Sequence, residues 1–100
     1  MRLRDRIDVI DENGAIVADD VRAYVGRPSA ESLAVLGMPD ADMRTYVALV
    51  AAESVPELDD LAHRIVWRGN RYSILVPPAL HMRGAKPHHY TVALTRVTTT

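Results

Sequence analysis

The chain has 100 residues, enough for one domain with a single modest core, so we expect residues 1–100 to form one domain. Its formal net charge of −1 provides no overall attraction to nucleic acid or to an acidic membrane surface. The absence of cysteine excludes disulfides, thiolate metal sites and cysteine nucleophiles. No apolar run approaches the roughly 18 residues of a membrane span, and no signal-peptide centre is visible, so we expect synthesis in a cytosol.

The first predicted element is a strand over residues 2–10, because charged and mostly apolar side chains alternate there. Ile7 and Val9 lie on its predicted inner face, and Asp5 is the one polar residue on that face. Arg2, Arg4 and Arg6 on the other face could contact phosphates, but such a row more often forms a solvated strand face.

A second strand is predicted over residues 15–25, after the turn signal Asn13-Gly14. Its apolar residues Val17, Val21, Ala23 and Val25 are expected on one side. The pair Asp19-Asp20 in the middle predicts a bulge or a break in this strand.

A short helix is predicted over residues 29–36, capped by Ser29 and ended by Gly37, with Leu33 and Leu36 packed against a sheet. Residues 42–51 fit both helical and strand spacing, but the run Thr-Tyr-Val-Ala-Leu-Val favours a strand.

The C-terminal half predicts three strands over residues 63–68, 71–77 and 88–97, arranged as a meander. Gly69-Asn70 is expected to form the tight turn between the first two, and Pro77-Pro78 to stop the second. The predicted core of the whole domain comprises Ile7, Val9, Leu33, Trp67, Tyr72, Ile74, Val92 and Leu94.

Little in the sequence predicts chemistry. Because adjacent strand residues point to opposite faces, His88 and His89 are not expected to chelate one ion together, although His81 and His63 could lie near them. No nucleophile with a positioned base and no glycine-rich phosphate loop is recognisable. We therefore expect no enzyme activity, no metal and no cofactor.

Several segments together resemble the head–tail joining proteins of long-tailed bacteriophages, also called head-to-tail stoppers or head-completion proteins. The resemblance begins with Arg4-Asp5-Arg6-Ile7-Asp8-Val9-Ile10 before Asn13-Gly14, and continues with residues 21–25, 28–31 and 43–49. Its most specific part is the hairpin pattern over residues 63–74, which contains Arg68-Gly69 and Tyr72-Ser73-Ile74, followed by residues 89–94. It spans nearly the whole chain.

The resemblance implies a mainly β protein: a small antiparallel β-barrel or sandwich of about six strands with one short helix. It also implies a ring, twelve-fold in the family, in the virion neck below the portal and adaptor. There the ring would seal packaged double-stranded DNA in the head and dock the tail terminator or tail-tube protein. A tail terminator or an adaptor ring remains an alternative of the same class. A small β-barrel that binds nucleic acid through Arg2, Arg4, Arg6, Arg83 and Lys86 is an alternative of another class.

Two predicted loops of opposite charge are the candidate functional segments. Residues 53–60 contain Glu53, Glu57, Asp59 and Asp60, which would repel DNA phosphates. Residues 81–87 form a basic loop, and the residues predicted to contact a neighbouring subunit or ring are His81, Arg83, Lys86 and His88. We expect the acidic segment to line the channel of such a ring as its gate.

Overall fold

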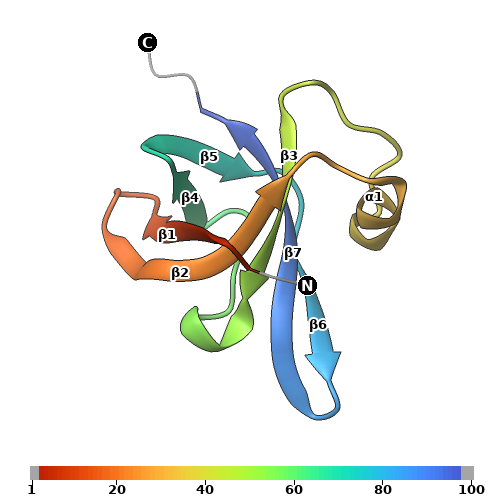
Figure 1. The fold of residues 1–100 in the computed structure, drawn as a ribbon. Helices are drawn as coiled ribbons and strands as arrows, with labels where there is room; N and C mark the ends of the chain where they lie inside the picture. The colour runs from red at the N-terminus through yellow and green to blue at the C-terminus, as the bar shows by residue number, and fades with distance from the viewer. Residues whose placement is uncertain (1–2, 98–100) are drawn as a thin grey trace.

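The computed structural model describes residues 3–97, and strands dominate it (Figure 1). Its elements are β1 (Asp5–Asp11), β2 (Ile16–Gly26), α1 (Ala30–Leu36), β3 (Thr45–Ala51), the 3-10 turn η1 (Ala52–Ser54), β4 (His63–Trp67), β5 (Asn70–Ile74), β6 (Ala79–Arg83) and β7 (Lys86–Arg96). No helix within residues 3–97 is both long enough and apolar enough to cross a bilayer.

Six antiparallel strands close into a barrel. They follow the order β3-β2-β1-β4-β5-β7, and pairing of β3 with β7 joins the two ends of the sheet. The prediction of a mainly β protein is confirmed. Because the sheet closes on itself, the fold is a barrel and not a sandwich. Strand β7 makes closure possible because it has 11 residues: its C-terminal half lies between β3 and β5, while its N-terminal half pairs with β6.

Two hairpin turns use residues with positive φ. Gly14 follows the first turn with φ 84°, and the carboxylate of Asp11 accepts the backbone N–H groups of Asn13 and Ala15 there. In the β4–β5 turn the central residues are Arg68 and Gly69, at φ 50° and 77°. The prediction of Gly69-Asn70 is therefore wrong by one residue, because Asn70 already pairs with Trp67.

A β-bulge interrupts β2 where Asp19-Asp20 predicts one. Ile7 pairs with Val21 and Val9 pairs with Ala18, so the two aspartates lie opposite a single residue of β1. Asp20 has φ 51°, and its N–H donates to the Asp8 carboxylate at 2.9 Å. The additional residue reverses the alternation, so the prediction that Val17 shares a face with Val21 is wrong, and Val17 is exposed.

The barrel interior is filled mainly by aliphatic side chains. Six of the eight predicted core residues belong to the buried cluster: Ile7, Val9, Tyr72, Ile74, Val92 and Leu94. Trp67 is only half-buried and packs at the edge of this cluster, against Tyr72 and Tyr46. Asp5 is tolerated near the interior because its carboxylate accepts the N–H of Val25 at 2.9 Å.

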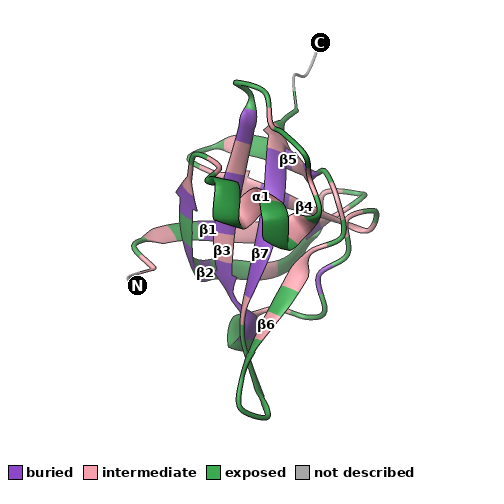
Figure 2. Ribbon diagram, turned by 90° about the vertical axis from the view of Figure 1, so that its right-hand side faces the viewer, coloured by how far each residue is buried: buried purple, intermediate pink, exposed green. Residues whose placement is uncertain are grey.

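Helix α1 lies on the outside of the barrel, over β3 and β7 (Figure 2). Ser29 caps it as predicted, accepting the Ser32 N–H, and Gly37 ends it at φ 70°. Leu33 is half-buried outside the barrel, so its assignment to the core is wrong. The residues that α1 covers include Val47 and Ala93, which pair directly and are buried without belonging to the interior cluster.

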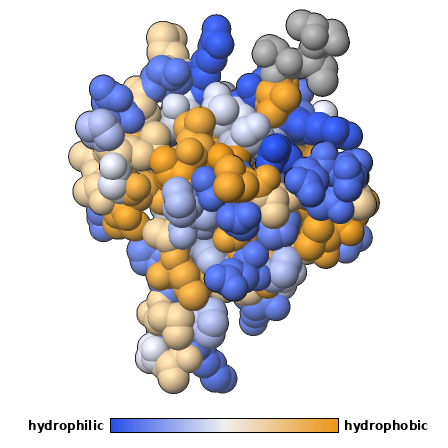
Figure 3. Space-filling view, turned by 180° about the vertical axis from the view of Figure 1, so that it is seen from behind, coloured by the Kyte–Doolittle hydropathy of each residue, from blue (hydrophilic) through white to orange (hydrophobic). Residues whose placement is uncertain are grey.

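Strand β6 is the element that the sequence pattern missed. Residues 79–83 pair with residues 86–91 of β7, so the predicted loop is a two-stranded hairpin with Gly84-Ala85 at its tip. Leu80 and Met82 alternate with His81 and Arg83, but this pattern is too short to predict a strand. The hairpin projects beyond the barrel (Figures 1 and 3), and the molecule measures 42 × 29 × 24 Å along its principal axes.

Candidate functional site

The projecting β6–β7 hairpin carries all four residues predicted to contact a neighbour. His81 and Arg83 lie on β6, whereas Lys86 and His88 lie on β7. Arg83 and Lys86 pair directly beside the tip, so two positive charges face each other across the hairpin. Like charges in this arrangement destabilise a hairpin unless an anion neutralises them.

A β-bulge at His88 brings three imidazoles together at the base of this hairpin. His81 pairs with His89 while Met82 pairs with Pro87, so His88 is the additional residue of β7. The Nδ1 atoms of His88 and His89 lie 2.7 Å apart, where one nitrogen donates and the other accepts. The prediction that these two side chains point to opposite faces is therefore wrong, because the bulge breaks the strand alternation on which it was based.

The three imidazoles are not arranged to hold one metal ion together. The His81 and His89 rings are stacked, with centroids 4.4 Å apart and planes 11° apart, so their in-plane lone pairs run parallel and do not converge. The Nε2 of His81 also lies 2.9 Å from the Thr91 hydroxyl. Within residues 3–97 no group of three or more His, Asp or Glu side chains is placed to hold a metal ion.

Burial lowers the pKa of His89 below its ordinary value of 6.5, and the positive charges of protonated His81 and His88 lower it further. The neutral form of His89 is therefore favoured near neutral pH.

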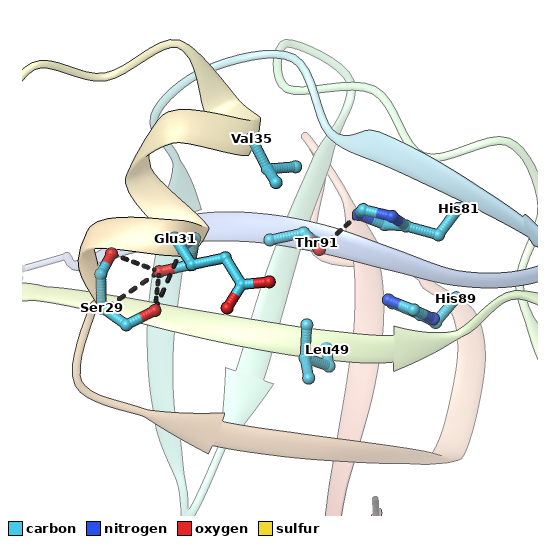
Figure 4. A pocket seen from close by; sticks show the side chains of 8 residues that line it. Ser29, Glu31, Val35, Leu49, His81, His89 and Thr91 are labelled. Atoms are coloured by element: carbon cyan, nitrogen blue, oxygen red, sulfur yellow. Dashed lines mark hydrogen bonds between the residues drawn. The ribbon is translucent and has the colours of Figure 1, made fainter.

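The carboxylate of Glu31 lies in a groove between α1 and the outer face of the sheet, which His81 and His89 also line (Figure 4). The groove has a volume of about 420 Å³. Val35 and Leu49 provide apolar walls, and Thr91, His81 and His89 line the side formed by β6 and β7. The arrangement combines one negative charge with apolar walls and polar groups, which suits an extended cationic side chain.

Sequence reasoning missed this groove because its residues come from distant parts of the chain. One signal was available in β3, where both faces are apolar or small, as expected for a strand that is covered on both sides. That signal indicates a covering element over Val47 and Leu49, but it does not identify Glu31 as the charge beside them.

The acidic segment predicted as a gate does not extend freely from the barrel. Leu58, only 5% exposed, belongs to the buried cluster, and Val55 packs against that cluster. The segment begins within the 3-10 turn η1 (Ala52–Ser54), and Leu58 anchors it in its middle. The segment therefore lies against the barrel, because an apolar residue within it completes the core.

The four acidic residues have different surroundings. Glu53 lies 3.5 Å from the Arg22 guanidinium. The Asp59 carboxylate accepts the Ala62 N–H at 3.0 Å and so shapes the turn into β4. Glu57 is exposed and Asp60 is half-buried, and no ion pair with either is present among residues 3–97. These two are the carboxylates of the segment best placed to act on a ligand.

The basic residues of the nucleic-acid alternative have separate environments. Arg6 lies 3.9 Å from the Asp20 carboxylate, and Arg4 is exposed before β1. Arg83 and Lys86 lie at the hairpin tip, and Arg2 lies outside the described residues.

The structure thus defines a class: a closed six-stranded antiparallel barrel with an outer helix and one projecting hairpin. No family model, no curated protein and no solved structure matches this chain. The function is therefore inferred from the residues, their arrangement and the resemblance of the sequence.

Proposed function

We propose that this protein is a ring-forming component of the neck of a long-tailed bacteriophage, acting as a head-to-tail stopper. The observation that carries the proposal is the place of the resembling segments in the fold. The hairpin pattern around Arg68-Gly69 forms β4 and β5. The other segments lie in β1, β2, β3 and β7, except residues 28–31 at the start of α1, so most of the resemblance lies in the barrel wall.

The closed barrel is compatible with such a ring and limits how copies can meet. Closure uses the edges of the barrel strands, which leaves the outer edge of β6 without a strand partner in the described part of the chain. Hydrophobic atoms on the face in Figure 3 are divided by hydrophilic ones, unlike the continuous apolar area of an obligate dimer. We therefore place the contacts between copies at the hairpin and the helix.

The test of this function is a nonsense mutation of the gene in the genome that encodes it. A stopper mutant should package DNA, fail to retain it and lack attached tails, and a plasmid copy should restore infectious particles. Elongated free tails would indicate a tail terminator. Normal infectivity without the protein would contradict every neck role.

The acidic segment remains our proposed gate, through the exposed side of residues 53–60. Deleting these residues would also remove Leu58 from the core, so the sharper variant is the double substitution Glu57→Gln and Asp60→Asn. Loss of like-charge repulsion should change DNA retention by filled heads. Glu12→Gln, in the first turn, is the matched control. Equal retention by wild type and the double variant would contradict the gate.

A further inference from the structure

The hairpin tip and the α1 groove each lack a partner within the described chain. Arg83 and Lys86 are exposed and face each other, and no carboxylate among residues 3–97 forms an ion pair with either. Glu31 is exposed in the groove and likewise has no cationic partner there. Opposite charges therefore lie unneutralised on two surfaces of the same molecule.

The shapes of these surfaces also correspond. The tip is narrow, because Gly84 at φ 62° and Ala85 are the only residues between the paired Arg83 and Lys86. The groove of about 420 Å³ exceeds one long side chain in volume and offers Val35 and Leu49 to its methylene groups. The Glu31 carboxylate can then accept hydrogen bonds from a guanidinium.

We infer that the β6–β7 tip of one copy docks in the α1 groove of the next copy, with Arg83 paired to Glu31. The contact joins two different surfaces, so it is heterologous and propagates from copy to copy into a closed ring or an open filament. It rests on the ring of the proposed function and identifies the surfaces that join its subunits. The neutralisation of facing Arg83 and Lys86 is the physical gain that docking provides.

The chain contains no cysteine, which makes site-directed cross-linking selective. Val35→Cys places a thiol on the groove wall and Ala85→Cys places one at the tip; both positions are exposed, and Glu31 and Arg83 are retained. With a short bismaleimide cross-linker, the double-cysteine protein should give a ladder of dimers, trimers and higher species. A mixture of the two single variants should stop at the dimer, and each single variant alone should remain monomeric.

Charge-reversal variants test whether the ion pair between Arg83 and Glu31 is needed for the ladder of cross-linked species. Glu31→Lys in the double-cysteine protein should lower the yield of cross-linked species about tenfold, the effect expected for losing a close charge pair at an interface. Adding Arg83→Glu and Lys86→Glu should restore the ladder. Glu12→Lys, which makes the same charge change in the first turn, should leave the yield unchanged. Circular dichroism must first establish that each variant is folded.

Three results would overturn the inference: a cross-link confined to one chain, a double-cysteine product that stops at the dimer, or a ladder that is insensitive to Glu31→Lys. The second result would indicate reciprocal exchange between two copies. Cross-linking on a portal–adaptor assembly tests the neck function and the tip-to-groove contact separately. A ring formed there without the tip-to-groove link contradicts this contact alone, whereas a ladder in solution without binding to the assembly contradicts the neck function alone.

Discussion

At the scale of single residues, positive φ values locate the strain in this fold. Arg68 and Gly69 both adopt left-handed conformations in the β4–β5 turn, and no heavy atom lies within 4 Å of a Cβ added at Gly69. Any cost of a side chain at Gly69 is therefore conformational and does not come from a clash. Arg68 offsets part of its own strain because its guanidinium lies 4.6 Å from the centre of the Trp67 ring.

Gly69→Ala is accordingly expected to lower the free energy of unfolding by about 1–2 kcal/mol, the usual cost of a left-handed L-residue. Arg68→Asn should cost less, since Asn-Gly is the preferred pair for such a turn. Urea denaturation measures both variants. Equal stability of Gly69→Ala and wild type would show that this turn changes conformation freely.

The histidine cluster predicts a pH dependence of stability. Because the folded-state pKa of His89 is lowered, the unfolded chain takes up this proton first as the pH falls below about 6.5. Stability should therefore be complete above that pH and decrease below it. Denaturation at several pH values from about 7.5 to 5 tests this. His89→Gln should flatten the decrease, whereas His63→Gln, outside the cluster, should retain it.

At the scale of elements, the acidic segment between η1 and β4 combines an exposed charged side with an apolar anchor. Leu58 fills the core at 5% exposure, whereas Leu61, three residues later, is 75% exposed. Because both residues are leucines, comparing them separates the effect of burial on stability from the effect of residue type. The segment is thus a structural part of the barrel as well as the candidate gate.

Leu58→Ala should lower the free energy of unfolding by about 2–5 kcal/mol, because it removes buried methyl groups and leaves a cavity. Leu61→Ala should change it by less than about 0.5 kcal/mol. Thermal or urea unfolding of both variants is the measurement. Similar values for the two would mean that the segment does not pack on the core in solution.

The β6–β7 hairpin obtains its shape from pairing and its side-chain directions from the bulge at His88. Without that additional residue, His88 and His89 would point to opposite faces and the three imidazoles would not meet. The bulge in β7 therefore gathers the imidazoles beside the groove that His81 and His89 line.

At the scale of the whole molecule, the neck role and the nucleic-acid alternative predict different binding to DNA. The net charge is −1, and the basic residues of the barrel and of the hairpin tip have separate environments. A protein that neutralises several phosphates shows binding that falls steeply with salt.

We therefore expect the isolated protein to bind duplex DNA weakly, with a shallow dependence on salt concentration. Fluorescence anisotropy with a labelled duplex, between about 50 and 200 mM salt, measures this slope. Arg83→Glu with Lys86→Glu tests the contribution of the tip. Tight binding with a steep slope that this double variant abolishes would favour the nucleic-acid module.

Predictions from local sequence were most successful where near neighbours determine the conformation. Ser29 and Gly37 fix the ends of α1 through their own hydrogen bonds and φ values, and Asp19-Asp20 marks a bulge that is present. Period-two alternation likewise located five of the six barrel strands, because a strand with one buried face must place apolar side chains at every second position. The sixth, β3, was predicted from its β-branched and aromatic residues, since its spacing fitted a helix as well.

Tertiary structure alone decided the features that depend on distant partners. β6 became a strand because β7 extends past the barrel and offers it an edge, and α1 covers the outer face of β3 and β7, which leaves Leu33 outside the core. The groove beside Glu31 and the meeting of His81 with His88 and His89 follow from the same long-range pairings. The sequence by itself thus determined the strands, the helix caps and the class of fold, since these are set by backbone preference and alternation. The pairing of β3 with β7, which closes the barrel, decides which surfaces face outward and which charges remain without partners.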